Sequence, residues 1–199
     1  MIFGLTGPTG AGKGTACHIF AKYGVPCVDT DRVYHTLLKE GGQMVDELTG
    51  AFGADILSEG TVNTKKLGAK VFGHPDTAER LHILNTITHK YVIERTHKMI
   101  GEMAQKGVKA VLIDAPQLFE AKIENECDLV IAVLADTELR LARILDRDSI
   151  TREMAIKRIN AQKSDTFFRE HCHHILENNG DLATLEAQIR AFLNNQGLL

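Results

Sequence analysis

The stretch that most constrains the fold is GLTGPTGAGKGTAC at residues 4–17. Residues 2–6, IFGLT, predict a short buried strand, and apolar residues after the loop recur at helical spacing. Gly7, Gly12 and Lys13 satisfy the spacing G-x-x-x-x-G-K of a phosphate-binding loop. There, backbone N–H groups surround phosphate oxygens, while the helix N-terminus and the lysine add positive charge. The strand–loop–helix order therefore predicts nucleotide binding rather than a glycine-rich turn that binds nothing.

Four more apolar stretches predict strands, at residues 25–31, 108–116, 127–135 and 174–178. Helical patterns separate them, as expected for an α/β fold with a parallel sheet wrapped on both sides. The longest helical pattern covers residues 76–105. Residues 41–105 carry no strand signal, so we expect a helical insertion beside the sheet.

Net charge and cysteine content narrow the possible binding partners and the cellular compartment. The pI of 6.3 and net charge of -3 disfavour binding of long nucleic acid by general electrostatics, although a local basic pocket for a small anion remains compatible. The four cysteines are scattered with no CxxC pair, which indicates free thiols in a reducing compartment. No leader or long apolar span precedes the first strand, so we expect a cytoplasmic protein that does not enter a membrane.

The metal position of the loop departs from the usual pattern. Gly14 stands where serine or threonine normally binds Mg²⁺, and Thr15 follows it. The letters GKGT resemble the loop of adenylate kinases, in which the metal is held largely through water. Asp114, at the end of the apolar run AVLID, either holds a metal-bound water at the edge of the sheet or serves as a cap or turn residue.

Two acidic residues lie at the end of the second predicted strand. Asp29 and Asp31 share one face at strand spacing, where a carboxylate suits a base that orients an acceptor hydroxyl and takes its proton. Alternatively, Asp31 caps the next helix.

Three arginines form a stripe further along the chain. Arg140, Arg143 and Arg147 stand at i, i+3 and i+7 of a predicted helix. Such a stripe either closes over a triphosphate or forms a solvated face with local acidic partners, since Asp136 lies four residues before Arg140. With the phosphate loop present, at least one of these arginines is expected to be functional.

These motifs, in this order, resemble the dephospho-CoA kinase family over nearly the whole chain. The resemblance is carried by GLTGPTGAGKGT, VPCVDTD, AFGADIL, VFGHPD, ITHKYV, LIDAPQLFE, RLARILDRDSITRE, AQ at residues 161–162, and ENNGDL. It implies transfer of the ATP γ-phosphate to the ribose 3′-hydroxyl of dephospho-CoA, with Mg²⁺. Departures from the family pattern include Gly14, Thr64 and Lys90.

The resemblance also implies roles for individual residues. Catalysis is expected from Asp31, Lys13, Arg147 and Arg143. Metal contacts are expected from Thr15 and Asp114. Acceptor contacts are expected from Asp31, His89, Pro116 and Phe119. Nucleotide contacts are expected from Thr9, Gly10, Ala11, Gly12, Lys13, Gly14, Thr15, Arg143 and Asn178, with Asn178 near the adenine.

The implied organisation is a single P-loop kinase domain over residues 1–199. Its core would be residues 1–40 and 106–199, its helical acceptor subdomain residues 41–105, and its lid residues 138–165. Two other functions stay open: another P-loop kinase for a nucleoside monophosphate or other small alcohol, and a non-catalytic ATP-binding relative. The only partner implied is the small-molecule substrate, with the oligomeric state open.

Overall fold

The computed structural model describes residues 1–199, whose contacts divide the chain into two compact units. The core unit consists of Met1–Val28 and Met103–Leu199, and the inserted unit of Asp29–Glu102. The helices include none that is long and apolar enough to cross a membrane.

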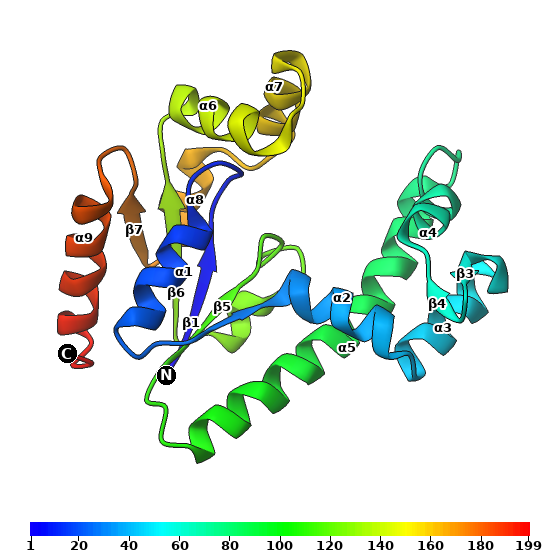
Figure 1. Ribbon diagram of the computed structural model, residues 1–199, viewed down its shortest axis with the longest axis horizontal. Coiled ribbons are helices and arrows are strands. Elements are labelled where there is room, and N and C mark those ends of the chain that lie inside the picture. Colours follow the sequence, from blue (N-terminus) through cyan, green and yellow to red (C-terminus); the bar gives the residue numbers. More distant parts are fainter. The chain divides into compact units, whose positions relative to one another are not determined.

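The core unit is built on a five-stranded sheet with the order β2-β5-β1-β6-β7 (Figure 1). The strands are β1 (Ile2–Thr6), β2 (Cys27–Asp29), β5 (Val111–Asp114), β6 (Leu129–Leu134) and β7 (His174–Glu177). Pairs β1–β5, β1–β6 and β6–β7 are parallel. All five predicted strands are therefore confirmed. The second is shorter than its apolar pattern because helix α2 already begins at Thr30.

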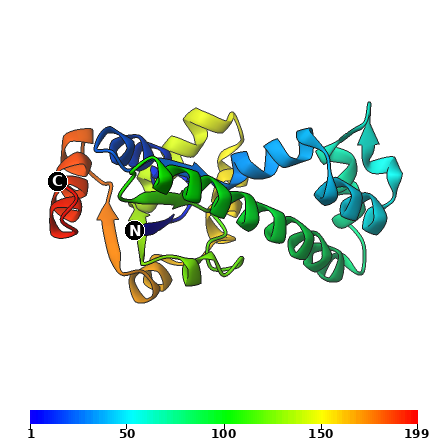
Figure 2. The ribbon, with the colours of Figure 1, turned by 90° about the horizontal axis from the view of Figure 1, so that it is seen from below.

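Helices cover both faces of this sheet, as the unbroken apolar strands predict. The helices of the core unit are α1 (Lys13–Lys22), α6 (Thr137–Asp148), α7 (Arg152–Asn160), α8 (Asp165–His171) and α9 (Leu182–Asn195), with a short 3₁₀ turn η2 (Ile123–Glu126). Helices α1 and α9 pack on one face and α8 on the other, whereas α6 and α7 pack against each other in a separate cluster at the top of Figure 1. Alternate residues of β6 enter different clusters: Ile131 packs with residues of α1 and α9, whereas Ala132 packs with Phe168 of α8. Figure 2 shows α9 in red alongside β7, and α9 also contacts α1.

The inserted unit has a hydrophobic core of its own. It contains α2 (Thr30–Glu40), α3 (Gln43–Phe52), a 3₁₀ turn η1 (Ala54–Ile56), β3 (Leu57–Ser58), β4 (Thr61–Val62), α4 (Thr64–Val71) and most of α5 (Thr77–Gln105). The long helix predicted at residues 76–105 is thus confirmed. The unit begins at Asp29 rather than near residue 41, because Leu38 of α2 packs with Met44 and Leu48 of α3.

The prediction that residues 41–105 contain no strand is wrong. Strands β3 and β4 form an antiparallel hairpin in which Leu57 pairs with Val62. Glu59 and Gly60 at its turn have φ of 50° and 79°, the left-handed conformations that a tight hairpin turn needs. Strands of two residues are too short for apolar alternation to reveal them.

Candidate nucleotide and phosphate site

The predicted phosphate loop runs from the end of β1 to the start of α1 in the core unit. Gly7, Gly10 and Gly12 all have positive φ, at 134°, 77° and 101°. A Cβ on Gly7 would lie 2.3 Å from the carbonyl oxygen of Val133, and one on Gly12 would lie 2.2 Å from Asn178 Nδ2. These glycines are therefore required by backbone conformation and by close packing against β6 and the loop after β7.

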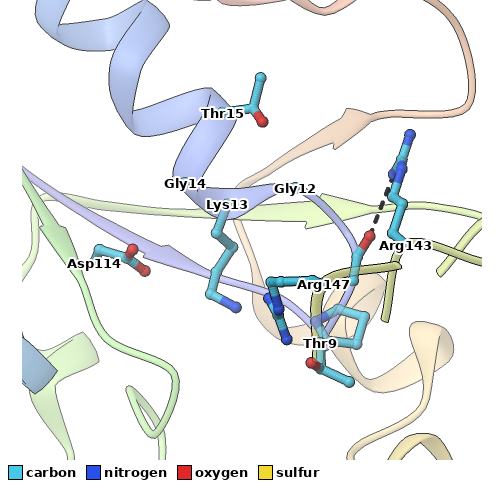
Figure 3. Close-up of a pocket in the computed structure, with 10 residues that line it drawn as sticks. Thr9, Gly12, Lys13, Gly14, Thr15, Asp114, Arg143 and Arg147 are labelled. Atoms are coloured by element: carbon cyan, nitrogen blue, oxygen red, sulfur yellow. Dashed lines mark hydrogen bonds between the residues drawn. The ribbon is translucent and has the colours of Figure 1, made fainter. Parts of the chain in front are cut away.

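A cavity of about 360 Å³ opens over this loop (Figure 3). It is lined by Pro8, Thr9, Gly10, Gly12, Lys13, Gly14, Thr15, Asp114, Arg143 and Arg147. Lys13 Nζ donates to the Gly7 carbonyl at 2.9 Å. In Figure 3 its side chain extends between those of Asp114 and Arg147. The structure thus brings predicted donor, metal and lid residues together around one polar space.

Asp114 ends β5, as the sequence pattern predicts, and its carboxylate lines the cavity. Its Oδ2 accepts a hydrogen bond from the Cys17 thiol at 3.6 Å. Together with Thr15 it offers hard oxygen donors beside the loop, a donor set that suits Mg²⁺. Whether either residue contacts a metal stays a prediction.

The arginine stripe divides into residues with different environments. Arg140 is 4% exposed, and its Nε donates to the Thr9 carbonyl at 3.1 Å. Burial lowers the pKa of Arg140, and Asp165 at 3.5 Å partly offsets that effect. Arg140 therefore holds the phosphate loop through Thr9 and does not line the cavity. The three arginines of the stripe thus do not all face a bound ligand.

Arg143 and Arg147 both line the cavity. Arg143 is half-buried and donates to the carbonyls of Gly10 at 3.3 Å and Asn178 at 3.0 Å. Arg147 is exposed and forms two hydrogen bonds to Asp148, at 2.6 and 2.9 Å. These bonds, with a further ion pair from Arg158, lower the pKa of Asp148 to about 2. Arg147 is thus the arginine with the greater freedom to rearrange.

Two amide side chains secure the loop. Asn178 is 8% exposed, and its Nδ2 donates to the Ala11 carbonyl at 2.7 Å. Gln162 Oε1 accepts from the Thr9 backbone N–H at 2.8 Å. The sequence pattern did not predict these contacts with the loop. Gln162 belongs to the AQ landmark of the family resemblance, but no role was assigned to it. That Asn178 lies near an adenine stays a prediction.

The predicted acceptor residues fall in both units. Pro116 and Phe119 belong to the core unit, where the Phe119 ring packs edge-on against Phe167 at 5.1 Å. Asp31 lies exposed in the first turn of α2, and His89 is half-buried on α5, both in the inserted unit. No observation tests their role in acceptor binding.

The N-cap of α2 is Asp29. Its Oδ1 accepts from the Arg32 backbone N–H at 3.0 Å. The alternative in which Asp31 itself caps this helix is therefore wrong, because the helix begins at Thr30, two residues earlier than that alternative requires.

Gly14→Ser should be tolerated. A Cβ on Gly14 has nothing within 4 Å, and its φ lies outside the positive range, so serine adds no strain. We expect a stability change within about 0.5 kcal/mol, measured by urea unfolding, and near-normal phosphoryl transfer. The matched control is Gly12→Ser, which should disrupt the loop by clashing with Asn178. Loss of activity in Gly14→Ser comparable to that in Gly12→Ser would contradict the prediction.

Comparison with known proteins identifies relatives along nearly the whole chain. Residues 1–184 match the family model described as dephospho-CoA kinase. A dephospho-CoA kinase of Latilactobacillus sakei is 33% identical over 192 residues, covering 96% of this chain and 94% of that protein. One of Dehalococcoides mccartyi is 36% identical over 182 residues, covering 89% and 88%. The crystal structure of TT1252 from Thermus thermophilus is similar with a TM-score of 0.80 and 28% identity, covering 98% of this chain and 97% of that one.

Proposed function

Because the chain belongs to the dephospho-CoA kinase family, we propose that it transfers the γ-phosphoryl group of ATP to the ribose 3′-hydroxyl of dephospho-CoA. The products are CoA and ADP. The observation that carries the proposal is the cavity over the glycine-rich loop. Lys13, Asp114, Arg143 and Arg147 line this cavity together with the loop.

The donor phosphates would bind in this cavity. Backbone N–H groups of the loop and the N-terminus of α1 favour anionic oxygens, and Lys13 adds a full positive charge. Two neighbours hold the loop in place before the donor binds: Arg140 at Thr9 and Asn178 at Ala11. A loop that needs little rearrangement stabilises developing charge without a reorganisation cost.

Mg²⁺ is part of the proposal and would be held near Thr15 and Asp114, largely through water because Gly14 offers no hydroxyl. The ion would neutralise charge on the β- and γ-phosphates. Asp114 contributes an acceptor that orients water, and Thr15 contributes a hydroxyl on the first turn of α1.

The acceptor would be activated by Asp31. Its carboxylate would orient the ribose 3′-hydroxyl and take its proton as the oxygen–phosphorus bond forms. His89, Pro116 and Phe119 are proposed acceptor contacts by family resemblance. A cytoplasmic location stays a prediction from the sequence.

The direct test of activity is acceptor-dependent ADP formation. Purified protein with ATP and Mg²⁺ should release ADP rapidly only when dephospho-CoA is added. Equal ADP release with and without dephospho-CoA would contradict the proposal, since it would indicate hydrolysis rather than transfer to this acceptor.

Arg147→Ala should lower kcat by roughly tenfold or more while changing the KM for ATP less. A contact made mainly to charge that develops during transfer is lost from the transition state more than from the bound ground state. Steady-state kinetics with varied ATP separates the two parameters.

Arg158→Ala is the matched control for this prediction. Arg158 pairs with the same carboxylate, Asp148, but it lies on α7 and outside the cavity lining. We expect near-normal kcat for Arg158→Ala. Equal kinetic losses in the two variants would assign the Arg147 effect to the ion pairs of Asp148 instead.

A further inference from the structure

Three side chains that can bind metal ions gather beside the phosphate loop in the core unit. Cys17 lies on α1, Cys27 begins β2 and Asp114 ends β5. The two Sγ atoms are 2.9 Å apart, and Cys17 Sγ is 3.6 Å from Asp114 Oδ2. One ligand atom from each residue lies within 4.8 Å of the other two. All three residues are half-buried, so water and small ions have partial access.

The fold explains this gathering. Cys17 stands one helical turn after Lys13, which directs both side chains to the same side of α1. Strand β2 is the neighbour of β5 in the sheet, which brings Cys27 toward Asp114. Asp114 also lines the phosphate cavity, whereas the two cysteines do not. The cluster is thus a separate donor set that shares one carboxylate with the proposed nucleotide site.

The donor chemistry differs from that of the magnesium position. Thiolates are soft ligands that select ions such as Zn²⁺, while Mg²⁺ prefers oxygen. With Zn–S near 2.3 Å and Zn–O near 2.0–2.2 Å, tetrahedral ligands stand about 3.5–3.8 Å apart. The distance from Cys17 Sγ to Asp114 Oδ2 already lies in this range. The two sulfur atoms would have to move apart by about 0.9 Å to reach the separation of two ligands of a tetrahedral zinc ion.

A bound dication would offset the cost of bringing these groups together as anions. Cysteine binds a metal ion as the thiolate, so the ion would replace the two thiol protons and neutralise the charge that the thiolates and Asp114 carry together.

We propose that Cys17, Cys27 and Asp114 form a binding site for a single thiophilic dication of the Zn²⁺ type, with water as the fourth ligand. Both thiols lose their protons to solvent on binding. The bound ion occupies Asp114 and thereby withdraws this carboxylate from the phosphate cavity. This second consequence, inhibition of phosphoryl transfer, rests on the proposed function; binding itself does not.

The binding test uses Cd²⁺ as a spectroscopic probe on the full chain, without nucleotide and with a non-thiol reductant. We expect a sulfur-to-cadmium charge-transfer band that saturates at one equivalent and disappears on addition of Zn²⁺. Cys17→Ser and Cys27→Ser should each weaken binding at least about tenfold. The alanine variants of both residues repeat the test in case either serine variant fails to fold, with circular dichroism as the check.

The chain supplies its own matched controls. Cys127 and Cys172 are also free and half-buried, but they lie outside the cluster. Cys127→Ser and Cys172→Ser should keep wild-type Cd²⁺ affinity. Unchanged affinity in the Cys17 and Cys27 variants would overturn the proposal, as would loss of two hydrogen atoms by intact mass without added metal, which indicates a disulfide.

The activity arm separates this proposal from the proposed function. At saturating Mg²⁺ and ATP, Zn²⁺ should inhibit the wild-type chain at lower concentration than Cys17→Ser. If the wild-type chain transfers no phosphate but shows the cysteine-dependent cadmium band, the cation site stands and the proposed function fails. If the wild-type chain transfers phosphate but shows no cadmium band, the proposed function stands and the cation site fails.

Discussion

Replacing Lys13 by alanine should lower turnover on the order of 10³-fold while leaving the fold intact. The residue supplies the cation of the phosphate loop and lines the cavity at the first position of α1. Removing one preorganised group that stabilises developing charge costs on the order of 10²–10³-fold in kcat, and a full charge belongs at the upper end of that range. The measurement is kcat under saturating ATP and dephospho-CoA.

Lys22→Ala is the matched control for this prediction. Lys22 lies in the last turn of the same helix, where it forms an exposed ion pair with Glu186 at 2.6 Å. Exposed pairs contribute little to stability because solvent screens them, so kcat and melting temperature should stay near wild type. A well-folded Lys13→Ala variant with near-normal turnover would remove Lys13 from the mechanism.

Asp31→Asn should slow phosphoryl transfer by ~100-fold or more, the usual scale of general-base effects. Asparagine keeps the size and some hydrogen bonding but does not take a proton. Binding of ATP and dephospho-CoA, measured by calorimetry, should stay close to wild type. Because the transition state of phosphoryl transfer is loose, part of the loss would come from poorer positioning of the hydroxyl.

Asp29→Asn controls for effects on the helix. Asp29 caps α2, and asparagine is about as good an N-cap as aspartate, so this variant should keep both stability and activity. Asp31 sits in the first turn, where its charge favours the helix by about 0.3–1 kcal/mol. Normal turnover in Asp31→Asn would reduce its role to this stabilisation of the helix.

The core sheet could be predicted because its signals are local. Strands β5 and β6 are apolar runs buried on both faces, which removes any need for alternation, while β2 and β7 carry shorter apolar signals. The β3–β4 hairpin could not be predicted in the same way. Its strands have two residues each, and its turn depends on positive φ at Glu59, a residue that rarely adopts it.

The candidate site was only partly predictable because several of its contacts join residues that are far apart in the sequence. Spacing on a helix places Arg140, Arg143 and Arg147 on one stripe, but it does not say what packs against each of them. Burial of Arg140 beneath Thr9 depends on a loop 131 residues away in sequence. The approach of Cys17 to Cys27 likewise joins a helix and a strand, with none of the close spacing that marks a metal motif.

The most direct test of the proposed reaction is an acceptor panel with ATP and Mg²⁺, scored by product mass and by the position of the new phosphate. The panel contains dephospho-CoA, AMP and other small alcohols. We predict that dephospho-CoA gains one phosphoryl group at the ribose 3′-hydroxyl, at a rate far above that of any other acceptor. Phosphorylation of AMP but not of dephospho-CoA, or no acceptor-dependent product at all, would contradict the account.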